Sequence, residues 1–259
     1  MSIFVATDAC KGCGACLATC PERALLRAPR RPAVIDALCT DCLACLEVCP
    51  VDAIVPVPPP VHPIEEASYR IMAERVDLSA WDGGERDVVA RMVHATADES
   101  FAGTARIGER AVEAAVAALA AGAPVVCDAR MVVAGIPSVA GAVCLLDEVP
   151  DAPPGGTRSA AAIRLAAKRH PDDALWVFGN APTALFALLE LHAAGALRPA
   201  AVVGLPVGYV GAAESKEALW SGRLRPVAIT NSGVRGGSPA AAGALNALAR
   251  LARAERTST

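Results

Sequence analysis

The chain has 259 residues and a formal net charge of −3, and 54% of its residues are hydrophobic. This length suits one small module plus one ordinary domain with a substantial core. The slight negative charge and the lack of any basic run argue against a nucleic-acid partner. No uninterrupted apolar stretch reaches membrane length, and the N-terminus lacks the basic and apolar segments of a secretory signal, so we expect no membrane span and no export.

A cysteine pattern occurs twice near the start of the chain. Each copy has spacings of two, two and three residues, with a proline after the last cysteine. This pattern is typical of proteins with two 4Fe–4S clusters, in which three thiolates of one copy bind one cluster and the fourth crosses to the other. The expected ligand sets are Cys10, Cys13, Cys16 and Cys49 for one cluster, and Cys39, Cys42, Cys45 and Cys20 for the other.

A zinc site or a disulfide framework is the alternative interpretation of these cysteines. Zinc sites usually pair two short CxxC hooks and need neither a third cysteine at this spacing nor the proline. The segment resembles bacterial two-cluster ferredoxins over its full length, which implies a small ferredoxin-like α+β domain at residues 1–57. Thiols reserved for iron also imply a reducing compartment, so we expect the protein in the cytoplasm.

The segment that follows is rich in proline, with five prolines among the nine residues 55–63 (VPVPPPVHP). Proline cannot continue a helix or a central strand, so this composition predicts a stiff, extended linker at residues 58–63. Beyond the linker, helical patterns alternate with short apolar runs. We therefore expect a second domain over residues 64–259.

The second domain has the pattern of a parallel sheet covered by helices. Continuous apolar strands separated by amphipathic helices indicate such a sheet, and right-handed crossovers then give a doubly wound α/β fold. The expected helices are 64–74, 85–96, 109–121, 159–169, 183–194, 212–220 and 239–253, and the expected strands are 125–127, 142–146, 174–178, 201–203 and 227–229.

Glycine-containing turns follow three of the predicted strands. They begin at Gly179, Gly204 and Thr230, and the last leads to Ser238 and Pro239, which have the form of an N-cap followed by proline at the first helical position. Ligands bind at this edge of such sheets, where an oxygen can approach free backbone N–H groups. A tight turn without a ligand is the simpler interpretation of any single one. No GxGxxG, Walker lysine or GxSxG motif is present.

Few titratable side chains are suited to catalysis. Of the four histidines, His62 lies in the proline-rich linker, and His170 and His192 lie at predicted helix ends, where they favour the helix dipole. His94 differs because Arg91 precedes it by three residues on the same helical face. A lone histidine in a helix is often structural, so composition alone leaves both roles open for His94.

From residue 64 to the end, the chain is similar to the precorrin-8X methylmutase family. The stretches that carry the resemblance come in the family's order and span the second domain. They are IEEASYRIM (64–72), RDVVARMVHAT (86–96), CDARMVVAGI (127–136), GNAPTALFALLEL (179–191), VVGLPVGYVGAAESKEAL (202–219) and VRGGSPAAAGALNALA (234–249).

The resemblance implies a flavodoxin-like α/β fold and a homodimer that binds a corrinoid substrate near the subunit interface. It implies an isomerase of cobalamin biosynthesis, which shifts a methyl group between adjacent ring C carbons of precorrin-8X or cobalt-precorrin-8 to give hydrogenobyrinic or cobyrinic acid. The family's catalytic histidine falls on His94, and its substrate-binding serine and arginine fall on Ser68 and Arg91.

Such a methyl shift can proceed as a concerted rearrangement, so we expect it to need no cofactor. A proton on the macrocycle would help, and imidazole can supply one near neutral pH. The carboxylates around a corrinoid suit an arginine, and Arg235 in the last turn is a further candidate for substrate binding. A solvated turn arginine is the alternative interpretation of Arg235.

The ferredoxin-like module is a departure from the family, because most members begin near the position that corresponds to residue 64 of this chain and have no such module. A redox-neutral rearrangement gains nothing from electrons, so the two clusters are expected to serve the corrinoid's cobalt, a redox partner or another cobalamin-pathway protein, or to form a docking or structural module. Two functions therefore stay open: a methylmutase with an accessory electron-transfer module, or an iron–sulfur electron-transfer protein that acts on a bound corrinoid, for example in cobalt reduction. The presence of Ser68, Arg91 and His94 together favours the first.

Overall fold

The structure of the chain is a computed structural model that describes residues 2–6, 8–29, 31–35, 38–57, 63–139 and 141–258. It divides into two compact units, Met1–Ala67 and Ser68–Thr259. The predicted linker, with His62, lies outside the described residues except for Pro63, which begins helix α3 (Pro63–Arg75). Within the described residues, no helix is both long and apolar enough to cross a membrane.

The first unit is a small α+β arrangement, as expected. Two strand pairs, β1 with β4 and β2 with β3, are antiparallel. Proline lacks the N–H group of a strand residue, yet Pro56 lies in β4 opposite Ile3, because a sheet of only two strands leaves one edge of each strand unpaired. The elements are β1 (Ser2–Val5), α1 (Ala15–Thr19), β2 (Leu25–Leu26), β3 (Ala33–Val34), α2 (Ala44–Glu47) and β4 (Ile54–Val57).

A five-stranded sheet forms the centre of the second unit, in the order β5-β9-β8-β7-β6. Strands β6 to β9 are parallel and lie in consecutive order, and β5 pairs antiparallel with β9 at one edge. The predicted α/β class with a parallel-dominated sheet is therefore confirmed. The strands are β5 (Ala105–Ile107), β6 (Val125–Cys127), β7 (Leu175–Phe178), β8 (Ala201–Gly204) and β9 (Ala228–Asn231).

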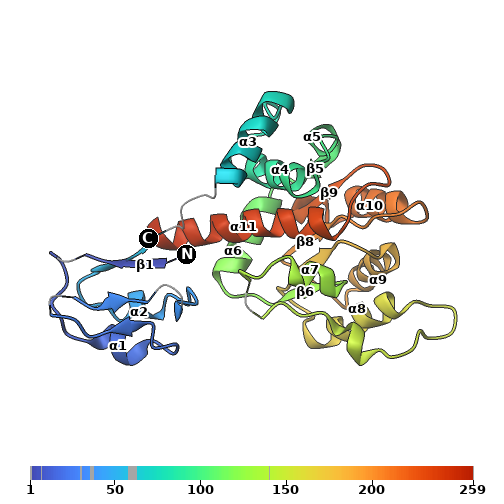
Figure 1. The fold of residues 1–259 in the computed structure, drawn as a ribbon. Coiled ribbons are helices and arrows are strands. Elements are labelled where there is room, and N and C mark those ends of the chain that lie inside the picture. Colours follow the sequence, from blue (N-terminus) through green and yellow to red (C-terminus); the bar gives the residue numbers. More distant parts are fainter. Residues whose placement is uncertain are drawn as a thin grey trace. The chain divides into compact units, whose positions relative to one another are not determined.

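Helices cover both faces of this sheet (Figure 1). In β7, Leu175 and Val177 belong to an apolar cluster that includes side chains of α4, α6, α7 and α11, whereas Trp176 and Phe178 belong to a cluster that includes side chains of α8, α9 and α10. Strands covered on both faces need apolar side chains at every position, which explains the continuous apolar runs in the sequence. The helices are α4 (Gly83–Thr96), α6 (Ala111–Ala120), α7 (Arg130–Ala134), α8 (Arg158–Arg169), α9 (Pro182–Ala193), α10 (Ala212–Ser221) and α11 (Ser238–Ser258).

The prediction of a strand at 142–146 is wrong. Only Val143 pairs with the sheet, through a bridge to Val126, and Leu145–Glu148 forms the 3-10 helix η2. Asp147 and Glu148 in η2 form ion pairs with arginines of α7 and α8, outside the sheet. Three short elements, α5 (Phe101–Thr104), β5 and α7, were not predicted, because three to five residues carry too little periodicity to be recognised. The other predicted elements are present with small differences in their bounds.

Candidate active site and cysteine cavity

The predicted catalytic histidine lies in the last turn of helix α4. The buried face of this helix consists of Val88, Val89, Met92 and Val93. Packing of that face against the core leaves Arg91 and His94 half-buried at its border. Their separation of three residues places both side chains on one side of the helix, as the sequence predicted.

Tyr69 from helix α3 contacts both of these residues. The tyrosine ring is stacked on the His94 imidazole, with 4.3 Å between the ring centroids and an angle of 8° between the planes. Arg91 Nη1 donates a hydrogen bond of 2.7 Å to Tyr69 Oη. Ser68, the third residue implied by the resemblance, precedes Tyr69 on α3 and is half-buried. A role for Tyr69 was not predicted, although its position beside Ser68 was an available signal.

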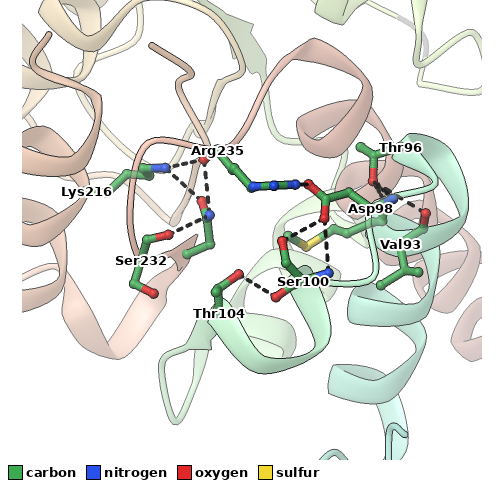
Figure 2. Close-up of polar contacts among 10 residues, drawn as sticks. Val93, Thr96, Asp98, Ser100, Thr104, Lys216, Ser232 and Arg235 are labelled. Atoms are coloured by element: carbon green, nitrogen blue, oxygen red, sulfur yellow. Dashed lines mark hydrogen bonds and ion pairs between the residues drawn. The ribbon is translucent and has the colours of Figure 1, made fainter. Parts of the chain in front are cut away.

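Arg235, the further candidate for substrate binding, forms an ion pair with Asp98 (Figure 2). Asp98 follows α4 after one residue, and its Oδ1 also accepts hydrogen bonds from the Ser100 amide at 3.0 Å and from the Ser100 hydroxyl at 2.7 Å. Partial burial opposes ionisation of Asp98, but the hydrogen bonds from Ser100 and Arg235 outweigh it and lower its pKa. The Arg235 side chain remains 63% exposed. The ion pair therefore links Asp98, just after the helix that carries His94, to an arginine that still faces solvent.

Lys216 of helix α10 is a buried cation that orders the turn after β9 (Figure 2). Its Nζ donates to Asn231 Oδ1 at 3.0 Å and to the Arg235 carbonyl, and Asn231 Nδ2 donates to the same carbonyl at 3.1 Å. Burial lowers the pKa of Lys216 to about 8. Lys216 thus supports the backbone of Arg235. No role was predicted for Lys216 from the sequence.

The glycine-containing turn after β7 holds a carboxylate of the chain itself. Asp128 Oδ1 accepts from the Gly179 amide at 3.0 Å, and Oδ2 accepts from the Asn180 and Ala181 amides at 2.8 and 2.7 Å. Burial raises the pKa of Asp128, and the three amides partly offset that effect. The expectation that a ligand oxygen could approach these N–H groups is therefore wrong for this turn, because Asp128 occupies them.

Asp128→Asn should lower the free energy of unfolding by about 1–3 kcal/mol. An amide has one acceptor oxygen, so an Asn side chain that accepts from Asn180 and Ala181 turns its NH₂ group toward the Gly179 amide and leaves that buried donor unsatisfied. Urea unfolding followed by circular dichroism measures the change. Asp172→Asn is the matched control, because Asp172 forms an exposed ion pair with Arg198. Equal losses in both variants would contradict this role of Asp128.

Ser238 begins helix α11 but does not act as the predicted N-cap. Its Oγ is buried and has no hydrogen-bond partner within the described part of the chain. The close contact at this helix start is made by backbone: Gly237 N donates to the Leu205 carbonyl at 2.8 Å, and a Cβ on Gly236 would come within 2.4 Å of the same oxygen. The glycines here permit close approach of two sheet-edge turns.

Four of the eight cysteines of the repeat lie around one cavity in the first unit. Cys10, Cys13 and Cys16 of the first copy and Cys49 of the second line this cavity. Four thiols around one cavity are the donor set that a 4Fe–4S cluster requires, and the presence of Cys49 supports the crossed arrangement. In the described ranges, no group of three or more His, Cys, Asp or Glu side chains is arranged to hold a single metal ion.

The two cysteine copies adopt the same backbone. Gly14 and Leu43 precede helices α1 and α2 at equivalent positions, and both have left-handed φ angles, of 80° and 57°. The fourth cysteines match as well: Cys20 Sγ accepts from the amide four residues later at 3.3 Å, and Cys49 Sγ does so at 3.2 Å. Such N–H···S bonds stabilise thiolates at iron–sulfur clusters. The second copy can therefore hold its cluster in the way the first does.

Protonation opposes metal loading at the buried thiols. Burial raises the pKa of the Cys45 thiol to about 11 and also raises the pKa of Cys16, the equivalent residue of the first copy. Iron binds the thiolate, so loading of each cluster must displace these protons.

Comparison with family models divides the chain in the same way. Residues 9–54 match a model of a 4Fe–4S dicluster domain, and residues 63–251 match the model described as precorrin-8X methylmutase. The second match covers more than half of the chain. The cysteine repeat and the His94 region thus fall in two separately recognised segments.

Individual relatives agree with the longer match. The chain is 43% identical over 198 residues to a precorrin-8X methylmutase of Sinorhizobium sp, covering 72% of this chain and 93% of the relative. It is 38% identical over 198 residues to a cobalt-precorrin-8 methylmutase of Methanothermobacter thermautotrophicus, covering 73% and 93%. A solved structure of precorrin-8X methylmutase from Thermus thermophilus is similar with a TM-score of 0.66 and 38% identity, covering 75% of this chain and 97% of that chain.

Proposed function

The chain belongs to the precorrin-8X methylmutase family, and we propose that it shifts a methyl group between adjacent ring C carbons of precorrin-8X or cobalt-precorrin-8. In this isomerisation a carbon–methyl bond breaks at one ring carbon and forms at its neighbour, with no net transfer of electrons. The product is hydrogenobyrinic acid or cobyrinic acid. The observation that carries the proposal is the imidazole of His94 held against Tyr69 and beside Arg91.

His94 is the proposed proton donor. A proton placed on a ring nitrogen or conjugated carbon makes the π-system of the macrocycle more electron-poor, which promotes migration of the methyl group. Imidazole can carry that proton at neutral pH, since its unperturbed pKa is about 6.5, and it can take the proton back when the product has formed. The half-buried position of His94 leaves part of the side chain accessible to a bound substrate.

Arg91, Arg235 and Ser68 are proposed to bind the substrate. A corrinoid carries many carboxylates, and an arginine forms charge-assisted hydrogen bonds with them. Arg235 can exchange Asp98 for a substrate carboxylate, because an ion pair with a mostly exposed guanidinium is weak. The Ser68 hydroxyl can donate one further hydrogen bond.

We also propose that the protein is a homodimer with the corrinoid near the subunit interface, as in the resemblance drawn from the sequence. Exposed apolar side chains in the turns after β8 and β9 support an interface at this edge of the sheet. Tyr209 and Val210 are 93% and 89% exposed, and Val207 and Val234 are also exposed. Apolar side chains gathered in this way commonly mark interaction surfaces.

The first unit is proposed to hold two 4Fe–4S clusters, one on Cys10, Cys13, Cys16 and Cys49 and the other on Cys39, Cys42, Cys45 and Cys20. When bound, such clusters supply one-electron transfer. The methyl shift is redox-neutral, so this module is an accessory that serves the corrinoid's cobalt or a redox partner of the same pathway. Thiol ligands of this kind require a reducing compartment, which supports a cytoplasmic protein.

Incubation of the purified full-length protein with precorrin-8X, in the absence of any reductant, tests this function. We expect the absorption spectrum to change to that of hydrogenobyrinic acid while the mass of the tetrapyrrole stays the same. Conversion only after a reductant is added would favour the alternative function, an iron–sulfur electron-transfer protein that acts on a bound corrinoid. No conversion of either precorrin-8X or cobalt-precorrin-8 would overturn the proposal.

A further inference from the structure

Tyr69 makes two different contacts with the two charged or titratable residues of the proposed site. Its ring face lies against the His94 imidazole, and its hydroxyl oxygen accepts a hydrogen bond from Arg91. Both contacts come from a separate helix, α3, in which Tyr69 lies 22 residues before Arg91 in the sequence. One side chain therefore sets the relative position of the proposed acid and the proposed substrate-binding arginine.

The geometry of the stack restricts how the imidazole can turn. With the two planes only 8° from parallel and the centroids 4.3 Å apart, a rotation of the His94 ring about its terminal bond would break the face-to-face contact. Aromatic rings are attracted in such arrangements, and the ring nitrogens of the histidine then lie along the edges of the stack, where they can reach a substrate.

The hydroxyl of Tyr69 can also donate a hydrogen bond. Its oxygen accepts from Arg91 Nη1 at 2.7 Å, so its own hydrogen must point elsewhere. A carboxylate that binds Arg91 can accept from the Tyr69 hydroxyl at the same time, because both donors are anchored at one point.

We propose that Tyr69 is a positioning residue that fixes the His94 imidazole and the Arg91 guanidinium relative to each other, and whose hydroxyl adds a second hydrogen bond to the carboxylate bound by Arg91. This inference rests on the proposed methyl shift. The two contacts of Tyr69 then have different roles. The hydroxyl contributes to substrate affinity, and the ring contributes to the rate of proton transfer by holding the imidazole.

Two variants of the full-length protein distinguish these contributions. Tyr69→Phe keeps the ring and removes the hydroxyl, so KM for precorrin-8X should rise about tenfold with kcat nearly unchanged, as expected for one lost hydrogen bond to a charged group. Tyr69→Leu removes the ring as well, so kcat should also fall about tenfold or more. Met72→Leu is the control. Met72 lies one turn after Tyr69 in α3 and packs on the core, and it takes no part in the ring stack with His94 or the hydrogen bond with Arg91.

A measurement on the substrate-free protein tests the stack independently of activity. The chain has only four histidines, so the imidazole proton resonances can be assigned by comparison with His94→Ala. The ring current of a stacked tyrosine shifts the His94 protons upfield; Tyr69→Phe should keep this shift and Tyr69→Leu should lose it. Unmoved His94 resonances in Tyr69→Leu, or unchanged KM and kcat in both variants, would overturn the inference.

The two proposals can fail separately. If the wild-type protein converts neither precorrin-8X nor cobalt-precorrin-8, the proposed function fails, and the resonances of His94 still decide whether Tyr69 holds the imidazole. If the wild type is active but Tyr69→Leu matches it in spectrum and kinetics, only the role of Tyr69 fails. If Tyr69→Leu does not fold, the KM of Tyr69→Phe decides the outcome.

Discussion

Replacement of His94 by alanine should reduce turnover of precorrin-8X by about two to four orders of magnitude, while the protein keeps its fold and still binds the tetrapyrrole. The physical reason is that the variant lacks the proposed proton donor but retains Arg91 and Tyr69, whose mutual hydrogen bond does not involve the imidazole. Conversion followed by absorption measures the rate, and circular dichroism and equilibrium binding measure the fold and the affinity.

His170→Ala is the matched control for this experiment. His170 caps the C-terminal end of helix α8, on the opposite face of the sheet from α4, and its removal should leave turnover unchanged. Near-normal turnover in His94→Ala would remove His94 from the mechanism. Equal losses in both variants would show that the effect is one of stability and not of chemistry.

Cys42→Ala should halve the iron and sulfide content of anaerobically purified protein, from about eight of each per chain to about four. The reason is that Cys42 is a proposed ligand of only one cluster, with Cys39, Cys45 and the crossing Cys20, whereas the other proposed set lines its own cavity. Iron and sulfide analysis gives the loss, and electron paramagnetic resonance of the reduced protein identifies the cluster that remains.

Two further variants make the result specific. Cys13→Ala, at the equivalent position of the first copy, should remove the other cluster and leave the signal that Cys42→Ala loses. Cys144→Ser should retain all the iron, because Cys144 lies in the second unit, outside the repeat. Because the methyl shift is redox-neutral, all three variants should convert precorrin-8X at the wild-type rate. Loss of both clusters from Cys42→Ala alone would contradict the assignment of independent ligand sets.

Local patterns in the sequence determined the class of both domains. Two cysteine copies with spacings of two, two and three residues are typical of two-cluster proteins, so the repeat predicted iron–sulfur clusters, and the cavity lined by Cys10, Cys13, Cys16 and Cys49 agrees with that prediction. The apolar runs of β7 and β8 predicted strands because burial on both faces excludes polar side chains. Arg91 and His94 share one side of α4 because residues three apart on a helix are neighbours.

Only the tertiary structure decided the contacts between elements. Tyr69 meets His94 because α3 packs beside α4, and Asp128 meets the Gly179 amide because β6 and β7 end side by side; no spacing in the sequence encodes either pair. The same is true of Lys216, whose burial against Asn231 depends on the packing of α10 on β9. A local pattern reports the preference of one segment for its own conformation. The partner of a side chain across two segments depends on how their apolar faces pack, and that is set by the whole core.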